Sequence, residues 1–389
     1  MRLNDFLSAK PMYYDQIDYT RFPRAYDCIK HRLNLPKVVH VVGTNGKGST
    51  GRFLAQILKL SGKKVGHYTS PHIFKFNERF WINGKDASDD ELEKAHEELL
   101  KYFDEYQKTT KFGENFIETL SYFEWATLLG AVLFRDFDEV VFEAGMGGEF
   151  DATNVFPKKL SIFTPVALDH VGMLGDTLED IATTKLNSMD KLAIICSDFS
   201  LMDLAKNIAK KRGCDILIAS KEISSEVAQY AFKFKLPSFL VDNLNLAVFS
   251  AKELGIQNSD EIVSHLDKLS LKGRLEKIAS NITIDVGHNA HAAREIAKNF
   301  TNKVYLIYNA FDDKDIKAVL NELKHIISKI LIYEYDSDNR KLAGEKISNI
   351  AKDFGIECEK FSNLEDDKNY LVFGSFMLVE HFLKDTIEK

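Results

Sequence analysis

The sequence predicts an α/β protein with two domains, each built around a mostly parallel sheet. Its 389 residues are too many for one ordinary hydrophobic core. Strand-like apolar runs alternate with helix-like stretches nearly throughout, which is typical of parallel sheets covered by helices. The pattern starts again near residues 271–273. We therefore expect a larger domain over residues 1–271 and a smaller one over residues 272–389.

The strand-like runs of the larger domain are apolar on both faces, as strands between two helix layers must be. Between the first two runs, the apolar residues Phe53, Leu54, Ile57 and Leu58 have helical spacing. A charged stretch starting near Ser88 predicts a solvated helix. The predicted strands are VVHVVG (38–43), KKVGHYTS (63–70), DEVVFEAG (138–145), KLSIFTPVALD (159–169), KLAIICS (191–197) and CDILIAS (214–220).

The smaller domain repeats the same arrangement. A strand, a polar loop and a helix are predicted within residues 280–300, and further strand-like runs follow, separated by helical stretches. These later strands are KVYLIYNA (303–310), SKILIYEYD (328–336), GIECEKF (355–361) and NYLVFGS (369–375).

Composition excludes several classes of function. The formal net charge of −7 argues against a general nucleic-acid binder, although a local basic pocket for an anionic substrate remains open. No apolar run approaches the roughly 20 residues that a membrane span needs, and the first residues lack the apolar core of a signal peptide. Four scattered cysteines without a CxxC pair predict reduced thiols in the cytoplasm. We expect a cytoplasmic protein without nucleic-acid or membrane partners.

The segment HVVGTNGKGST (40–50) has the composition of a phosphate-binding loop. It joins a predicted strand to an amphipathic helix, where backbone N–H groups and the helix dipole attract anions. Its spacing departs from the common phosphate-loop pattern, because Val41 replaces the first glycine and Gly48 separates the lysine from the hydroxyls. A glycine-rich turn without a ligand is the alternative. The candidate nucleotide-binding residues are Asn45, Gly46, Lys47, Gly48, Ser49 and Thr50.

Three polar side chains follow other predicted strands, and with Lys47 they should lie at one edge of the sheet. They are Ser70, Glu143 and His170. In open α/β sheets, ligands bind outside the carboxyl ends of the strands. Each residue also has an ordinary interpretation, as a turn serine, a solvated carboxylate or a packed histidine. Together they are candidate ligands for Mg²⁺, although imidazole is unusual for so hard an ion.

The motifs together resemble the Mur ligase superfamily and, within it, the bacterial folylpolyglutamate synthase/dihydrofolate synthase family. They occur in family order from about Val38 to Ser375. The motifs are GTNGKGS, TSPH…FNERF.ING, E.GMGG..DATN, ALDH…LG.TLEDIA, GRLE, D.GHN.HA, DKD and GS. The resemblance implies a P-loop-type central domain, a Rossmann-like C-terminal domain and an ATP-dependent ligase that joins L-glutamate to a carboxylate through an acyl phosphate.

The resemblance also assigns roles to single residues. Lys47 matches the phosphate-loop lysine, Ser70 and Glu143 match magnesium ligands, and His170 matches a ligand of the metal cluster. The segment ETLSYFEWATLLG resembles the pterin-binding region, with Tyr122 or Phe123 as stacking groups, although both rings also suit a core. Further matches to ATP-binding residues are Asn243, Arg274, Asp285 and His288.

Lys185 matches a lysine that the superfamily often carries as a carbamate. Lys185, Lys47 and His170 are the catalytic residues that the resemblance implies. A carbamate would replace a cation by an oxygen ligand. The alternative is an ordinary lysine on a helix surface, because the chain reads TTKLNS where the family usually has glutamate-lysine-alanine-glycine. The family also usually has arginine or lysine where Glu149 stands.

The expected substrates are ATP, L-glutamate and either dihydropteroate or a reduced folate, and we expect both activities in one monomeric enzyme. A cell-wall Mur ligase would need a UDP-sugar domain ahead of the phosphate loop, which begins near residue 43. Three further functions remain open. They are another Mur-type amide ligase, a nucleotide-driven switch that ligates nothing, and a kinase of a small metabolite.

Overall fold

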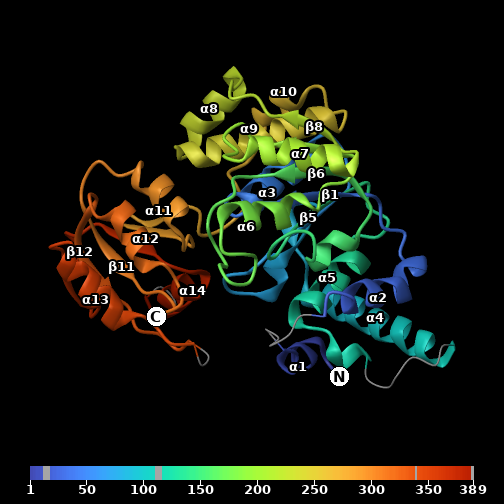
Figure 1. Ribbon diagram of the computed structural model, residues 1–389, viewed down its shortest axis with the longest axis horizontal. Helices are drawn as coiled ribbons and strands as arrows, with labels where there is room; N and C mark the ends of the chain where they lie inside the picture. Colours follow the sequence, from blue (N-terminus) through green and yellow to red (C-terminus); the bar gives the residue numbers. More distant parts are fainter. Residues whose placement is uncertain (12–17, 110–115, 338–339, 387–389) are drawn as a thin grey trace. The chain divides into compact units, whose positions relative to one another are not determined.

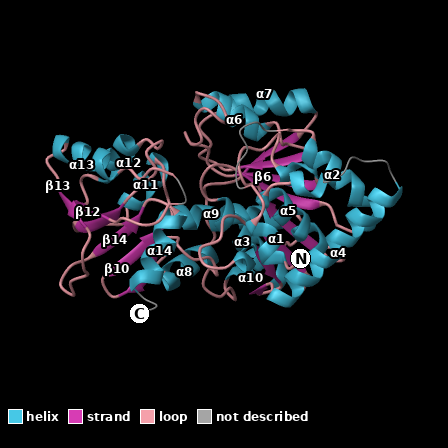
Figure 2. Ribbon diagram, turned by 90° about the horizontal axis from the view of Figure 1, so that it is seen from below, coloured by secondary structure: helices cyan, strands magenta, loops and turns pink. Residues whose placement is uncertain are grey.

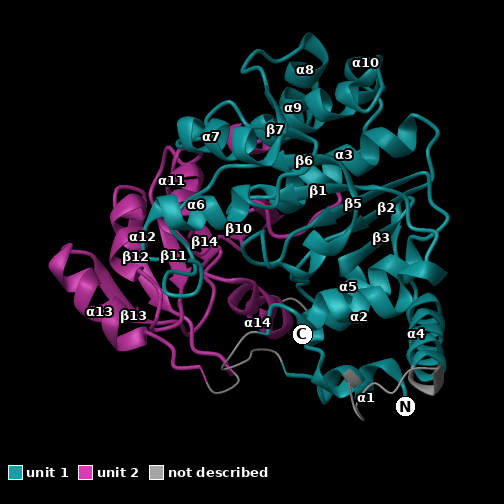
Figure 3. Ribbon diagram, turned by 45° about the vertical axis from the view of Figure 1, so that its right-hand side comes forward, with its two compact units in different colours: residues 1–234, 241–269 teal, residues 235–240, 270–389 magenta. Residues whose placement is uncertain are grey.

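The computed structural model describes residues 1–11, 18–109, 116–337 and 340–386. Its contacts divide the chain into two compact units, which Figure 3 shows in different colours. Unit 1 comprises Met1–Phe234 and Val241–Leu269, and unit 2 comprises Lys235–Leu240 and Ser270–Lys389. The expected functional domains, residues 1–271 and 272–389, stay a prediction.

Unit 1 contains a large mixed sheet. Its strands are β1 (Val38–Val42), β2 (Val65–Tyr68), β3 (Phe80–Ile82), β4 (Lys85–Asp86), β5 (Glu139–Glu143), β6 (Lys158–Phe163), β7 (Leu192–Ile195) and β8 (Asp215–Ile218). Within the described residues they form eight strands in the order β4-β3-β2-β5-β1-β6-β7-β8. The six strands β2, β5, β1, β6, β7 and β8 pair in parallel with their neighbours. Strands β3 and β4 add an antiparallel edge beside β2.

The centre of this sheet is β1, which lies between β5 and β6. All five of its residues are buried, because helices cover both faces of the sheet (Figure 2). The parallel pairing places the carboxyl ends of β2, β5, β1 and β6 side by side along one edge. That edge therefore collects the polar segments that follow these four strands.

The helices of unit 1 pack on both faces of the sheet. Trp125 and Phe142 lie in a large apolar core formed with the N-terminal helices. No helix among the described residues has the length and apolar character to cross a membrane. The helices are α1 (Leu3–Ser8), α2 (Arg21–Ile29), α3 (Lys47–Leu60), α4 (Asp89–Thr109), α5 (Tyr122–Leu133), α6 (Leu178–Leu186), α7 (Met202–Arg212), α8 (Ser225–Phe234), α9 (Ser238–Glu253) and α10 (Ser259–Val263). The first turn of α9 belongs to unit 2, and the helix belongs to unit 1 from Val241 on.

The hairpin of β3 and β4 is a feature that our sequence reasoning did not predict. Its turn residues, Asn83 and Gly84, both have positive φ, at 49° and 118°. An Asn-Gly pair between two short strands is the usual signal for such a turn. The hairpin extends the sheet beyond β2 by antiparallel pairing.

Unit 2 is a second α/β structure with its own core, which includes Leu306, Leu320 and Leu371. Its strands are β9 (Glu276–Ala279), β10 (Ile282–Asp285), β11 (Val304–Tyr308), β12 (Ile327–Ile332), β13 (Glu357–Lys360) and β14 (Tyr370–Phe373). They form a sheet in the order β13-β12-β11-β14-β10-β9, in which β9 alone is antiparallel to its neighbour among the described strands. The helices are α11 (Ala290–Ala297), α12 (Ile316–Leu323), α13 (Gly344–Asp353) and α14 (Phe376–Thr386). The predicted α/β fold class is confirmed for both units (Figure 1).

Candidate active site

The phosphate loop connects β1 to the N-terminus of α3. Gly46 precedes the helix with φ 87°, and a Cβ at this position would lie 2.6 Å from Oδ1 of Asn243, so both its conformation and its surroundings require glycine. The backbone N–H groups of Thr44 and Asn45 donate to the carbonyl of Pro165, at 2.9 and 3.3 Å. The loop is thus fixed to the segment after β6, and Asn243 of α9 lies directly against it.

Lys47 is the first residue of α3 and lies beside a carboxylate. Its Nζ is 3.2 Å from the carbonyl oxygen of Thr44 and 3.9 Å from Oε1 of Glu143. Both partners lie where strands of the sheet end, so the ammonium group is held at the edge predicted from the sequence. A cation at the start of a 14-residue helix adds to the positive end of the helix dipole. This combination attracts phosphate.

Ser49 and Thr50, in the first turn of α3, are buried, with 1% and 0% of their surface exposed. In the part of the chain that the structure describes, neither hydroxyl oxygen has a hydrogen-bond partner. Buried hydroxyls without partners are costly unless a ligand satisfies them. Their position at a helix N-terminus makes phosphate oxygens or a hydrated cation the ligands that fit.

Glu143 ends β5 and is almost fully buried. Its Oε2 accepts a hydrogen bond from the hydroxyl of Thr69 and another from the backbone N–H of Ser70, the latter at 3.2 Å. The structure therefore brings together Ser70 and Glu143, two of the three predicted metal ligands. Thr69 was missed by the sequence analysis, because a threonine at the end of an apolar strand carries no distinct signal.

His170 has a strained backbone, with φ 53°, in the left-handed region that non-glycine residues rarely adopt. Its N–H donates to Oδ1 of Asp169 at 2.9 Å, and its Nε2 lies 3.9 Å from Oδ2 of the same residue. Such strain is often found at functional sites. Among the described residues, no group of three or more His, Cys, Asp and Glu side chains is assembled into a metal-binding cluster. The role of His170 as a metal ligand stays a prediction.

Lys185, in the last turn of α6, is buried, with 4% of its surface exposed. The alternative of a lysine on a helix surface is therefore wrong. Its Nζ donates to the carbonyl of Gly43 in the phosphate loop at 2.9 Å. Burial, reinforced by the cation of Lys47, lowers the pKa of Lys185 to about 7, while Asp169 and Asp151 oppose the shift.

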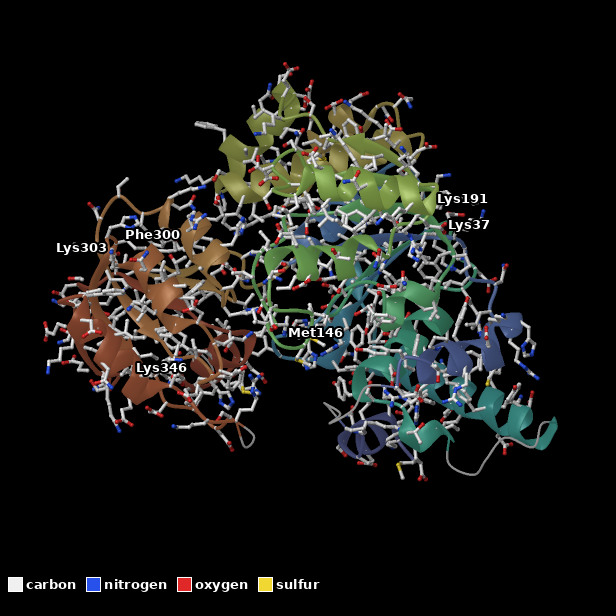
Figure 4. The ribbon with its side chains drawn as sticks, viewed as in Figure 1. Lys37, Met146, Lys191, Phe300, Lys303 and Lys346 are labelled. Carbon is white, nitrogen blue, oxygen red and sulfur yellow. The ribbon has the colours of Figure 1, made fainter. Side chains whose placement is uncertain are left out.

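The glycine loop after β5 is organised by Asp151. This carboxylate accepts the backbone N–H groups of Met146 and Thr153, both at 2.9 Å, and the hydroxyl of Thr153 at 2.5 Å. Figure 4 labels Met146 in this loop. Burial raises the pKa of Asp151 above its usual value, although these hydrogen bonds oppose the shift. The hydroxyl of Thr153 also contacts Nε2 of His40, on β1, at 2.8 Å.

The two candidate folate-stacking rings begin α5 and are half-buried. Phe123 lies against the glycine loop, with a ring carbon 2.5 Å from the place that a Cβ on Gly145 would take. Tyr122 packs on Phe76 with ring centroids 5.5 Å apart, and the guanidinium of Arg79 lies 5.3 Å from its ring. Both rings pack against the apolar core. Phe123 also contacts Tyr68, near the end of β2, with ring centroids 6.1 Å apart.

The three candidate residues of unit 2 surround the end of β10. Asp285 accepts the backbone N–H groups of Leu275 and Gly287, at 2.8 and 2.7 Å, and burial raises its pKa. The guanidinium of Arg274 lies 5.2 Å from the ring of Phe376, and Nδ1 of His288 is 3.3 Å from the carbonyl of Val286. Their predicted contacts with ATP stay predictions.

The unit 1 arrangement suits the transfer of a phosphoryl group. It combines a helix N-terminus, a lysine ammonium, two buried hydroxyls and a carboxylate. In proteins, groups of these kinds favour polyphosphate and its accompanying cation. A second, buried lysine with a lowered pKa, Lys185, donates to the carbonyl of Gly43 in the same loop.

No family model matches the sequence. The chain is similar to folylpolyglutamate synthetase from Helicobacter pylori, whose solved structure is 40% identical with a TM-score of 0.80, covering 100% of this chain and 98% of that one. It is 29% identical over 370 residues to the dihydrofolate synthase/folylpolyglutamate synthase of Buchnera aphidicola subsp. Baizongia pistaciae, covering 87% of this chain and 84% of the relative. The bifunctional folylpolyglutamate synthase/dihydrofolate synthase of Yersinia pestis, solved with AMPPNP and Mn ion, shares the fold with a TM-score of 0.81 and 24% identity, covering 99% of this chain and 98% of that one.

Proposed function

The chain belongs to the folylpolyglutamate synthase/dihydrofolate synthase family, and we propose that it is an ATP-dependent ligase that joins L-glutamate to dihydropteroate, to the γ-carboxylate of a reduced folate, or to both. The observation that carries this proposal is the full-length likeness to the Helicobacter pylori enzyme, at 40% identity. The contacts of Lys47 with Thr44 and Glu143 at the phosphate loop support it independently.

The proposed reaction has two steps. An oxygen of the substrate carboxylate attacks the γ-phosphorus of ATP, and ADP leaves, which gives an acyl phosphate. The amine of glutamate then attacks the acyl carbon and loses a proton to solvent, and phosphate leaves from the tetrahedral intermediate to give the amide. Negative charge is present on every reactant, so Lys47 and the N–H groups that open α3 provide the stabilisation. The hydroxyls of Ser49 and Thr50 supply further donors to the phosphates.

The oxygen ligands present suit Mg²⁺, which we propose as the cofactor. Ser70 and Glu143 lie side by side, because the N–H of Ser70 donates to the carboxylate. Hydroxyl and carboxylate oxygens are what Mg²⁺ prefers, and His170 would be a less usual third ligand. When bound, Mg²⁺ would neutralise charge on the phosphates. The Mn ion and AMPPNP in the Yersinia pestis relative support the use of a divalent cation with ATP.

We assign the carbamate to Lys185. Only a neutral amine reacts with CO₂, and the lowered pKa of about 7 leaves a substantial neutral fraction at physiological pH. The reaction forms a C–N bond and releases one proton. The resulting anion would lie beside the phosphate loop, because Nζ of Lys185 lies 2.9 Å from the carbonyl of Gly43, and it would supply oxygen atoms in place of an ammonium. The proposed catalytic role of Lys185 rests on this assignment. Lys47 and His170 are the other two proposed catalytic residues.

The remaining substrate contacts are proposed from the sequence motifs. Asn243 would contact the nucleotide, and its position against Gly46 supports this. The same role is proposed for Arg274, Asp285 and His288 in unit 2. Tyr122 or Phe123 would stack on the pterin, which is supported by their half-buried rings at the start of α5. Four free thiols support a reducing, cytoplasmic location. The monomeric state is proposed from the family resemblance.

The test offers the purified protein ATP, Mg²⁺ and L-glutamate with either dihydropteroate or tetrahydrofolate, and measures ADP. We expect glutamate-dependent ADP release with both acceptors. Release with only one acceptor would establish a single activity. ADP release that ignores glutamate would favour a nucleotide-driven switch or a kinase, and would overturn the proposal. Release with other acid and amine pairs alone would favour a different Mur-type amide ligase.

A further inference from the structure

We propose that Glu149 and Asn187 form a clasp that positions Lys185 against the phosphate loop. Nδ2 of Asn187 donates a hydrogen bond of 2.7 Å to Oε2 of Glu149. The backbone N–H of Glu149 donates to the carbonyl of Thr184 at 2.8 Å. These two bonds join the glycine loop to the last turn of α6, on either side of Lys185 in the sequence. The inference rests on the proposed function of Lys185.

The backbones approach each other closely at the clasp. A Cβ placed on Gly148 would lie 2.7 Å from the carbonyl oxygen and 2.8 Å from the Cα of Lys185. Real Cβ atoms do not approach so closely, so the glycine loop rests directly on the backbone of Lys185. The carbonyl of Glu149 in turn accepts a hydrogen bond of 2.7 Å from Nδ2 of Asn154. The loop therefore has fixed ends and little freedom to move away from the helix.

The clasp is connected to Lys185 by a short stretch of chain that is held by hydrogen bonds. Asn187 is two residues further along the chain, and the carbonyl of Lys185 accepts the hydroxyl of Ser188 at 2.6 Å. The side chain of Lys185 is buried along its length and ends 2.9 Å from the carbonyl of Gly43. Since α6 is only nine residues long, a shift of its last turn would move the amine relative to the phosphate loop.

The choice of an amide opposite an acid has a physical reason. The C-terminal end of a helix carries partial negative charge, so a carboxylate next to it is unfavourable unless a donor faces it. Asn187 supplies such a donor, whereas aspartate at the same position would repel Glu149. A glutamine at position 149 would keep an oxygen acceptor for Asn187 without the charge.

The experiment compares Glu149→Ala, Asn187→Ala, the double variant and Glu149→Gln, with the two-acceptor assay and acetylation of lysines by acetic anhydride as readouts. We expect kcat to fall about tenfold in each alanine variant, with KM for ATP within about twofold, and no further fall in the double variant. Glu149→Gln should remain within about twofold of the parent protein. Acetylation of Lys185 should accelerate in the alanine variants.

Lys10 is the internal control, since it is a buried lysine of unit 1 that donates to the carbonyl of Ile117, far from the clasp in the sequence. Acceleration at Lys185 with unchanged labelling at Lys10 would support the clasp. Equal acceleration at both lysines would show general loosening and overturn the positioning role, and so would parent-like kcat and labelling in both alanine variants. If the parent protein lacks ligase activity, the proposed function fails, and labelling of Lys185 still decides whether the clasp exists.

Discussion

Nζ of Lys185 lies 2.9 Å from the carbonyl oxygen of Gly43, so a lysine from α6 contacts the first residue of the phosphate loop. The same loop leads into α3, whose first residue, Lys47, has its Nζ 3.9 Å from Oε1 of Glu143. The first lysine is buried with a lowered pKa, and the second is partly exposed at a helix N-terminus. The two side chains are chemically the same, but one amine is buried and the other lies partly exposed at a helix N-terminus. We therefore expect different chemistry for each lysine.

Replacement of Lys185 by alanine should lower kcat at least about 100-fold, because the carbamate cannot form. In the parent protein, the occupancy of the carbamate should rise as pH increases through about 7, because the amine must lose a proton first. Mass spectrometry of the native protein measures the occupancy as one CO₂, which is lost on acidification. A free amine in a fully active protein would refute the carbamate.

Lys47→Ala should abolish turnover, with a fall of at least about 1,000-fold, while the fold stays intact. The side chain is partly exposed and its removal opens no core cavity. Lys59→Ala, in the last turn of the same helix, is the matched control and should keep parent activity. Turnover and thermal unfolding by circular dichroism measure the two effects. Normal turnover in Lys47→Ala contradicts the phosphate role.

The buried ion pair of Arg21 and Glu124 should be important for stability. Arg21 donates from Nε and Nη2 to both carboxylate oxygens of Glu124 at 3.0–3.2 Å. The exposed fraction is 9% for the side chain of Arg21 and 11% for that of Glu124. Arg21→Ala removes the hydrogen bonds of a guanidinium from a buried carboxylate, which should lower the free energy of unfolding by about 3–5 kcal/mol. Urea denaturation measures this change in the free energy of unfolding.

A matched control lies one turn along α2. Arg24 pairs with Asp18 at 3.0 Å, but 49% and 45% of these side chains are exposed. Arg24→Ala should therefore change the free energy of unfolding by no more than about 1 kcal/mol. Equal effects of the two arginine substitutions would show that burial does not determine the strength of these pairs.

Stability should fall in mild acid because two histidines are buried in the sheet. Burial, the larger cause, and a nearby cation lower the pKa values of His40 and His67 well below 6.5. The unfolded chain takes up a proton at each imidazole as pH falls through 6.5, whereas the folded protein does not. Their contribution is therefore fully present above this pH and decreases below it, by about 1.4 kcal/mol per pH unit for each histidine.

Urea denaturation between pH 7.5 and pH 5, as approximate limits, measures this slope. His67→Gln should reduce the slope, because this substitution removes one of the two imidazoles with a lowered pKa. An unchanged slope in His67→Gln would mean that its imidazole titrates alike in the folded and unfolded chains.

Apolar periodicity was enough to predict the architecture. Each apolar run that was predicted as a strand contains a strand that pairs in parallel with a neighbour, because burial on both faces requires such runs. The elements that were missed are short or carry charge. Strand β4 has two exposed residues, Lys85 and Asp86, and β9 includes Glu276 and Lys277. Edge strands of this kind depend on pairing with a neighbour, which periodicity does not reveal.

The candidate site was predictable where strand order alone decides position. Lys47, Ser70 and Glu143 follow adjacent parallel strands, and the structure places them in contact. The burial of Lys185 was not predictable from periodicity, because it depends on how α6 meets the glycine loop. The contact between Glu149 and Asn187 likewise joins residues 38 positions apart, and neither carries a motif that indicates the other.

The most direct test of the account follows one oxygen atom. Dihydropteroate labelled with ¹⁸O in its carboxylate is incubated with the protein, ATP, Mg²⁺ and L-glutamate, and the released phosphate is analysed by mass spectrometry. If a carboxylate attacks the γ-phosphorus, each phosphate carries one labelled oxygen. Amide formation with unlabelled phosphate, or ADP release with label retained in unchanged dihydropteroate, would contradict acyl phosphate formation at this site.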